Sequence, residues 1–363
     1  MGAVLAVAVA TGTVAAPGHG PSRSRDRAAA RGGPPATRAR SGSALLVCPG
    51  AARRFAAVTT PLPFVSVVVP TWNRAALLGH CLATLVAQDY PRDRFEIVVV
   101  DDGSTDGTAE VAESLPTEPP PVLRYVRQPH RGVNAGRNTG IEAARGDPIC
   151  FVDDESDVPR GWLTAIVDGV RRRADAGCLG GPIRLRFEST PPRICVMESW
   201  AREGELDWGP EERVVPHING GNMAVRRWAL GRVGRFHDAL SCPGDETEWQ
   251  RRLQQIGIPI VYLPAAWLEH RRPAEVLKPL NLLRRRFRQG RATVTYTRLI
   301  GEPLPGLGYL ADIPFYIVHA LRYRCFGALL SVAWKLGRIT GRLRPEGGLP
   351  IEPKTPGGGA TRG

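Results

Sequence analysis

The residues best suited to chemistry in this sequence are three short clusters of carboxylates: Asp101–Asp102, Asp153–Glu155 and Asp245–Glu246. Carboxylates crowded together repel one another unless a cation or a hydrogen-bonding ligand lies among them. Oxygen-only ligands favour a hard divalent ion such as Mg²⁺ or Mn²⁺, which commonly bridges protein carboxylates to nucleotide phosphates. The third cluster could instead supply a general base. Together they indicate a metal and nucleotide site.

The first and third clusters also have a simpler interpretation when each is taken alone. Asp101 and Asp102 precede Gly103 and Ser104, so they could form a turn that caps the next helix. Asp245 and Glu246 begin an expected helix, where the helix dipole favours acidic side chains. The sequence by itself leaves these alternatives open, so the elements that position the clusters have to be considered.

Strands and helices alternate from Phe64 onward. Apolar β-branched runs predict strands at 64–70, 97–100, 122–128, 148–156, 178–187 and 258–264. Helical spacing or composition predicts helices within 77–86, 108–115, 132–145, 163–170 and 244–257, the last closed by Gly257. This order predicts a mostly parallel sheet with helices on both faces. The first two acidic clusters then lie at carboxyl ends of strands, where ligands bind in such sheets.

Four stretches resemble the family 2 glycosyltransferases of GT-A fold. They are SVVVPTWNRAALLGHCLATLVAQDYPRDRFEIVVVDDGSTDGT, NAGRNTGIEAARGDPICFVDDES, NGGNMAVRR and GDETEWQRRL, in the same order and spacing, over roughly residues 64–272. The resemblance implies an α/β, Rossmann-like fold with a mixed, mostly parallel sheet flanked by helices. It also implies inverting transfer of a sugar from a nucleoside-diphosphate sugar, such as a UDP-sugar, to an acceptor hydroxyl.

The resemblance also assigns a nucleotide site. Its expected members are Pro70, Thr71, Asn73, Asp102, Arg137, Asn138 and Asp153. Asp102 is expected to accept hydrogen bonds from the nucleobase, which is uracil or another pyrimidine in relatives. Arg137 and Asn138 are expected near the diphosphate or the sugar.

The metal, the loop and the base are assigned in the same way. The metal, Mg²⁺ or Mn²⁺, is expected among Asp153, Asp154, Glu155 and His270, although a lone histidine is more often structural. Gly221 and Asn222 are expected under the donor sugar and the acceptor, where a glycine lets the backbone approach closely. Relatives usually have Glu-Asp at the base motif, and this chain has Asp245-Glu246. Glu246 matches the base by position, and Asp245 remains its rival.

The acceptor could be a saccharide, a lipid-linked sugar or a small molecule, in a cell-envelope polysaccharide, a glycolipid or a secondary metabolite. The absence of a Gln-x-x-Arg-Trp motif favours single transfer. Two other functions stay open, a nucleotidyltransferase-like enzyme and a catalytically silent nucleotide-binding scaffold. A nucleic-acid partner is not expected, because no stacking aromatics accompany the basic ends.

The composition divides the chain into four regions. The formal charge is +13, and eight arginines against one acid give residues 1–60 a charge of +7. We therefore expect a disordered basic extension (1–62), a catalytic domain (63–275), a basic amphipathic helical region (276–345) and a disordered tail (346–363). The seven cysteines are an odd number and are scattered along the chain, which indicates reduced thiols in the cytoplasm. The helical region either contacts the inner face of the cytoplasmic membrane peripherally or packs on the catalytic domain.

Overall fold

The computed structural model describes residues 61–114, 121–190, 204–238, 240 and 245–343, with the backbone alone at Asp245. These residues belong to one compact unit that begins at Thr60. The regions predicted to be disordered, 1–62 and 346–363, lie outside the described residues apart from 61 and 62.

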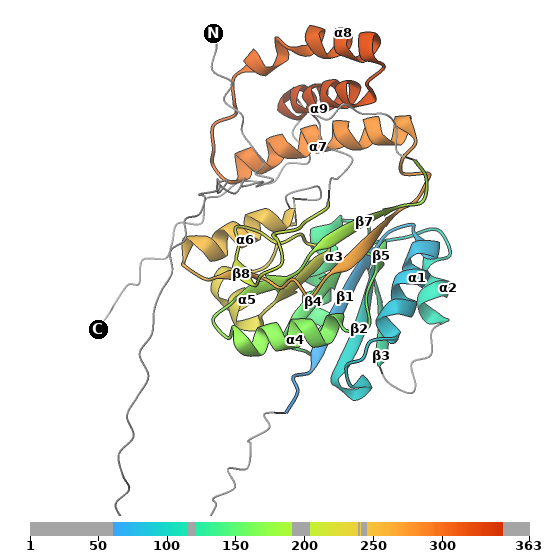
Figure 1. Cartoon of the computed structure of the whole chain (residues 1–363), viewed down its shortest axis with the longest axis vertical. Helices are drawn as coiled ribbons and strands as arrows, with labels where there is room; N and C mark the ends of the chain where they lie inside the picture. The colour runs from blue at the N-terminus through green and yellow to red at the C-terminus, as the bar shows by residue number, and fades with distance from the viewer. Residues whose placement is uncertain (1–60, 115–120, 191–203, 239, 241–244, 344–363) are drawn as a thin grey trace, which may run out of the picture. The chain divides into compact units, whose positions relative to one another are not determined.

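An eight-stranded mixed sheet forms the centre of the fold (Figure 1). Its spatial order is β3 (Val122–Arg127), β2 (Phe95–Asp101), β1 (Val65–Thr71), β4 (Ile149–Val152), β9 (Asn222–Val225), β6 (Cys178–Gly180), β10 (Ile260–Tyr262) and β8 (Arg213–Val214). The pairs β2–β3, β1–β2, β1–β4 and β6–β10 are parallel, whereas β9 runs antiparallel to both β4 and β6. The mixed, mostly parallel sheet expected from the sequence is confirmed.

Helices cover both faces of this sheet, because successive strand side chains point to opposite faces. Val67 and Val69 of β1 join a core with α1 (Ala75–Val86), α2 (Thr108–Glu113) and α4 (Trp162–Arg172). Val68 joins a second core with α3 (Val133–Ala143), α5 (Arg227–Val233) and α6 (Asp245–Gln255). After α6, Gly257 has the predicted left-handed backbone, with φ +74°.

The sequence prediction was wrong about 178–187, which is two strands and not one. β6 stays in the main sheet, whereas β7 (Ile183–Phe187) enters a second sheet of order β5 (Ser156–Asp157), β11 (Leu268–Arg272) and β7. The chain passes from the first sheet to the second at Gly181 and Pro182. A Cβ at Gly181 would lie 2.1 Å from the Ala266 carbonyl oxygen, and Pro182 has no N–H for a sheet ladder. The expected strand 148–156 likewise ends at Val152, so the acids that follow lie between the two sheets.

Three helices follow the second sheet: α7 (Pro279–Leu299), α8 (Ile313–Tyr323) and α9 (Phe326–Leu343). The helices α7 and α9 lie side by side (Figure 1). Their backbones meet at glycines, since a Cβ at Gly290 would lie 2.0 Å from the Trp334 carbonyl oxygen and one at Gly337 2.0 Å from that of Phe287. Among the described residues, none of the helices combines the length and apolar character needed to cross a bilayer.

Candidate active site

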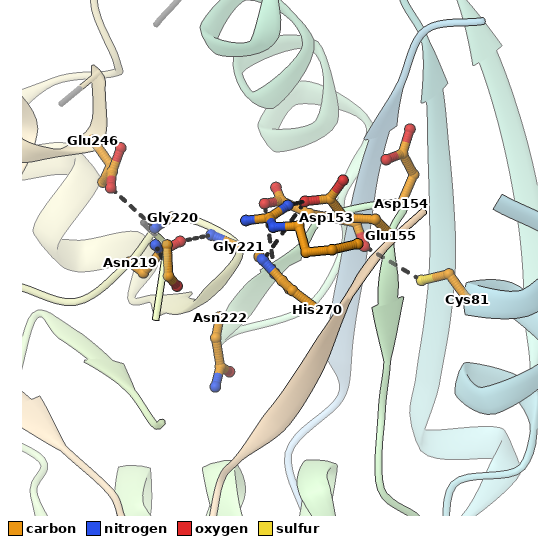
Figure 2. A network of polar contacts seen from close by, with 12 residues as sticks. Cys81, Asp153, Asp154, Glu155, Asn219, Gly220, Gly221, Asn222, Glu246 and His270 are labelled. Carbon is orange, nitrogen blue, oxygen red and sulfur yellow. Dashed lines mark hydrogen bonds and ion pairs between the residues drawn. The ribbon is translucent and has the colours of Figure 1, made fainter. Parts of the chain in front are cut away.

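The carboxyl ends of β1, β2 and β4 bring most of the predicted site residues together. Because β2 and β4 both run parallel to β1, Asp101–Asp102 and Asp153–Glu155 follow strands that end at the same sheet edge. The loop 219–221 and the start of α6 complete the site, and Figure 2 shows Glu246, this loop and His270 as neighbours. The structure therefore places these acids, the loop and Glu246 at one edge of the sheet.

The Asp102 carboxylate accepts three hydrogen bonds from its own chain and lies beside a ring nitrogen of His130. Its Oδ1 accepts from Gln128 Nε2 (2.6 Å) and the Arg131 backbone N–H (2.9 Å). Its Oδ2 accepts from the Gly132 backbone N–H (2.8 Å) and lies 2.8 Å from His130 Nδ1. A carboxylate has about four lone-pair positions, so these bonds leave about one position, beside His130, for the nucleobase contact predicted for Asp102. In this structure Asp102 holds the segment 128–132 in place.

Residues 70–74 connect the first two acidic clusters. Asn73, in a left-handed conformation at φ 53°, donates its backbone N–H to Ser104 Oγ (2.8 Å). Its Oδ1 accepts the backbone N–H of Thr105 at 2.7 Å. Thr71 Oγ1 donates to Asp154 Oδ2 at 2.8 Å. Pro70 packs near Gly136 at the start of α3. These residues lie where a nucleotide pocket is expected, and their contact with a nucleotide stays a prediction.

Trp72 and His130 belong to this region and were missed by the sequence reasoning. Their rings stack with centroids 4.2 Å apart and an interplanar angle of 23°. Trp72 remains 44% exposed, although large aromatic side chains are usually well covered. The signal available in the sequence was the tryptophan between Thr71 and Asn73, at the end of an otherwise buried strand.

The acids at 153–155 do not share one environment. Arg74 Nη1 donates to Asp154 Oδ1 (2.9 Å) and Glu155 Oε2 (3.1 Å), and Arg272 also pairs with Glu155. Burial would raise the pKa of Glu155, but Arg272 and Arg74 outweigh it and lower that pKa. Burial raises the pKa of Asp154 to about 6, although the charge of Arg74 and the hydrogen bond from Thr71 act to lower that pKa. Asp154 and Glu155 are therefore neutralised by arginines that the sequence reasoning did not select.

Asp153 differs from its two neighbours, because its side chain is 34% exposed and faces a buried histidine. The distance from His270 Nε2 to Asp153 Oδ2 is 3.7 Å, and neither ring nitrogen of His270 has a hydrogen-bond partner among the described residues. Burial lowers the pKa of His270, so the imidazole favours its neutral, ligating form. An orphaned nitrogen beside a carboxylate oxygen suits a divalent ion. The four predicted metal ligands do not converge, and the described residues contain no cluster of three potential ligands.

The two glycines of the 219–222 segment fit closely between functional side chains (Figure 2). A Cβ at Gly221 would lie 2.3 Å from Asp153 Oδ2 and 2.9 Å from His270 Cε1. A Cβ at Gly220 would lie 2.4 Å from Arg137 Nη2. The Asn222 side chain is fully buried and bonds to Trp162 Nε1, the Pro182 oxygen and the Ala266 oxygen. The predicted substrate contact of Asn222 stays a prediction, and its side chain presents no exposed surface here.

Glu246 lies across the double-glycine segment from Asp153. Its Oε1 accepts the Gly220 backbone N–H at 3.2 Å. The side chain of its rival Asp245 lies outside the described part of the structure. Arg137, which is buried, bonds to Asn134 Oδ1 (2.9 Å) and approaches Gly220. Asn138 instead bonds to the Phe236 oxygen (2.9 Å) and Asp238 Oδ1 (2.6 Å), so it fixes the segment 236–238.

The chain is similar to known glycosyltransferases. The family model described as glycosyl transferase family 2 matches residues 66–234. The chain is 28% identical to Glycosyltransferase AglE of Haloferax volcanii, over 79% of this chain and 97% of AglE. It is 29% identical to the succinoglycan biosynthesis protein ExoM of Rhizobium meliloti, over 67% and 77% of the two chains. It is 30% identical to a validoxylamine A glucosyltransferase of Streptomyces hygroscopicus, over 58% and 56%.

The fold also matches a solved structure. GalNAc-T7, crystallised with UDP, GalNAc and Mn²⁺, superposes with a TM-score of 0.50 and 18% identity, covering 64% of this chain and 48% of that one. At this identity the similarity concerns the fold, which is the GT-A fold that the sequence resemblance implied.

Proposed function

This chain belongs to glycosyltransferase family 2, and from that premise we propose that it transfers a sugar, with inversion, from a nucleoside-diphosphate sugar to an acceptor hydroxyl. The observation that carries the proposal is the position of the double-glycine segment. Glu246 lies on one side of it and the Asp153–His270 pair on the other. A donor sugar lying over the two glycines would have a base at one end and a leaving-group site at the other.

The donor's nucleotide occupies the edge formed by β1 and β2 in this proposal. The exposed Trp72 ring offers a stacking surface to the base. Asp102 acts on the base mainly by holding the segment 128–132, whose backbone it fixes. Arg137 carries positive charge beside Gly220, where a donor diphosphate or sugar would pass. A UDP-sugar is the donor expected by family resemblance.

Asp153 and His270 would hold the divalent ion, because they offer a free carboxylate oxygen and an orphaned imidazole nitrogen. When bound, Mg²⁺ or Mn²⁺ supplies Lewis-acid charge that stabilises a departing diphosphate. Arg74 and Arg272 keep Asp154 and Glu155 paired, so those two acids shape the site without adding net negative charge to it.

Glu246 acts as the general base in the proposed reaction. As the acceptor oxygen forms its bond to the anomeric carbon, its proton passes to the Glu246 carboxylate. The bond between that carbon and the diphosphate oxygen breaks on the opposite side, and the diphosphate leaves with the electron pair. The Gly220 N–H, bonded to Glu246 Oε1, aims the carboxylate at the space above the glycines.

The acceptor class is the least constrained part of the proposal. One relative is named for the biosynthesis of succinoglycan, a saccharide, and another is named as a glucosyltransferase for validoxylamine A, a small molecule.

We include contact with an anionic membrane surface in the proposal because α8 exposes Phe315 (62%), Val318 (60%) and Leu321 (77%) near Arg322. An amphipathic helix of this kind lies in the interface with its apolar face in the lipid.

The test is a panel of nucleotide-sugars incubated with the purified protein and Mn²⁺ or Mg²⁺, with nucleoside diphosphate release as the readout. We expect Glu246→Gln to lower the turnover rate by about 10²- to 10⁴-fold while donor binding persists. The control is Glu113→Gln, which changes an exposed acid at the end of α2.

Four other results have distinct meanings. Pyrophosphate as the product would replace the transferase by a nucleotidyltransferase-like enzyme. Failure of every nucleotide-sugar to bind would favour the silent scaffold. Donor binding without release would lead to a second panel of acceptors, and activity equal to wild type in Glu246→Gln would exclude Glu246 as the base.

A further inference from the structure

A pocket of about 670 Å³ lies between α7 and α9, apart from the residues of the candidate active site. Its lining, which we call the α7–α9 pocket, consists of Asn281, Leu283, Arg284, Phe287, Arg288, Ala333 and Leu336. No acidic side chain is among these lining residues. The exposed fraction of Leu336 is 45%, so the apolar part of the pocket is open to ligands from solution.

The spacing on α7 creates two parallel rows in this pocket. Residues four apart on a helix lie on the same face. Leu283 and Phe287 therefore form an apolar row, and Arg284 and Arg288 form a basic row beside it. Ala333 and Leu336 of α9 face the pocket from the other helix, which glycine contacts hold close to α7.

The two arginines of the basic row are available to a ligand. Both side chains are exposed, and neither is paired with a carboxylate within the described part of the chain. Arginine presents a fork of N–H donors that matches the geometry of a phosphate. Two such groups beside an apolar row are complementary to a molecule that joins a phosphate to a hydrocarbon chain.

We propose that the α7–α9 pocket binds a single lipid phosphate. The phosphate contacts Arg284 and Arg288, and the hydrocarbon chain lies along Leu283 and Phe287 against Leu336. This proposal gives the basic helical region a function that differs from donor binding and from membrane contact by the exposed face of α8. That this lipid carries the acceptor sugar rests on the proposed transferase function, whereas the binding itself does not.

The binding test uses the full chain and decyl phosphate below its critical micelle concentration, followed by calorimetry. Decyl maltoside provides the same hydrocarbon chain without the charge, and inorganic phosphate provides the charge without the chain. We expect decyl phosphate to bind at least about tenfold more tightly than either, since it combines charge-assisted hydrogen bonds, which decyl maltoside lacks, with apolar contact, which inorganic phosphate lacks.

Two variants and one matched control locate the binding. Arg284→Gln with Arg288→Gln is expected to weaken decyl phosphate binding about tenfold, and Ala333→Phe to weaken it by narrowing the pocket while keeping the charge. Arg160→Gln with Arg232→Gln removes the same charge from two exposed positions outside the pocket and should leave binding unchanged. Circular dichroism spectra and thermal unfolding of each variant show whether it is folded.

Several results would overturn the proposal. These are equal binding of decyl maltoside, equal binding of inorganic phosphate, or equal loss of affinity in the control variant. Binding only to phosphatidylglycerol vesicles, unchanged in the pocket variants, would assign the contact to a membrane surface instead. Since decyl phosphate binding requires no turnover, a wild-type protein that binds decyl phosphate but binds no nucleotide-sugar would overturn the proposed function and leave the pocket proposal intact.

Discussion

At the residue scale, the chemistry of the acidic stretch 153–155 depends on which positive groups reach each carboxylate. Arg74 and Arg272 neutralise Asp154 and Glu155, whereas Asp153 has no arginine partner among the described residues and faces Nε2 of His270. Three neighbouring acids of similar chemistry therefore lie in different environments. The side chain of Asp153 is the partly exposed one of the three, which suits contact with an ion and its diphosphate.

The first residue-scale prediction concerns the metal. His270→Gln and Asp153→Asn should each weaken Mn²⁺ binding in the presence of nucleoside diphosphate by about 10- to 100-fold, the range typical of perturbed metal sites. Electron paramagnetic resonance of free Mn²⁺ measures this directly. His80→Gln, at an exposed position of α1, is the matched control. Unchanged Mn²⁺ affinity in both site variants would exclude this pair as the metal site.

The second residue-scale prediction concerns Asp102, whose carboxylate accepts three hydrogen bonds and lies 2.8 Å from His130 Nδ1. Asp102→Asn replaces one oxygen by an NH₂ group that cannot accept, so buried donors lose their partner. We expect the free energy of unfolding to fall by about 1–3 kcal/mol without any ligand present. Urea unfolding measures it, with the exposed Asp89→Asn as the control. A variant as stable as wild type that loses only nucleotide affinity would show that Asp102 serves the nucleobase alone.

At the element scale, glycines decide how closely helices approach. Gly337 of α9 faces the Phe287 carbonyl oxygen, and a Cβ there would lie only 2.0 Å from it. A backbone atom cannot move aside as a flexible side chain can, so α7 and α9 would have to separate. The same contact sets the width of the α7–α9 pocket, because Phe287 and Leu336 line it.

Gly337→Ala should therefore destabilise the protein by about 1–3 kcal/mol, the usual cost of overpacking. Gly231, within α5, is the matched control, because a Cβ at that position has no atom within 4 Å. Gly231→Ala should stabilise by about 0.5–1 kcal/mol, since alanine loses less backbone entropy in a helix. Chemical unfolding compares the two variants, and shifts of the same sign would refute the packing argument.

At the scale of the whole molecule, stability in acid depends on carboxylates held in the charged form. Burial would raise the pKa of Asp101, but hydrogen bonds from Ser104 and from Tyr125 outweigh it and lower that pKa below 3.8. The unfolded chain therefore binds a proton at Asp101 before the folded chain does. The stability from Asp101 is present above pH 3.8 and is lost as the pH falls through the lower pKa of the folded state.

Tyr125→Phe removes one of these donors, the hydroxyl 2.5 Å from Asp101 Oδ2. We expect the variant to be less stable at neutral pH and to lose less of its remaining stability on acidification. The difference from wild type should therefore shrink as the pH falls below about 4, the ordinary range of an aspartate pKa. Urea midpoints from pH 7 to pH 2.5 measure this. A constant difference across the series would show that Tyr125 contributes packing alone.

The sequence by itself determined the α/β alternation, the acids at the ends of two strands and the glycines at 220–221. These features are local: hydrophobic periodicity, turn chemistry and motif spacing are all present within short stretches of the chain. Gly257, for example, ends α6 because a left-handed residue is needed there. The family resemblance likewise rests on short motifs, which is why the sequence could predict Glu246, with Asp245 as its rival, as the candidate base.

Only the tertiary structure decided which acids are available and which are already paired. Arg74 lies 80 residues from Asp154, and Arg272 lies 117 residues from Glu155. His270 reaches Asp153 from β11, a strand that the sequence did not predict. The split of 178–187 between two sheets likewise depends on Ala266, whose carbonyl oxygen leaves no space for a side chain at Gly181. Such contacts arise from the path of the whole chain, because the side chains that neutralise or free a charge need to be near it in space and not in sequence.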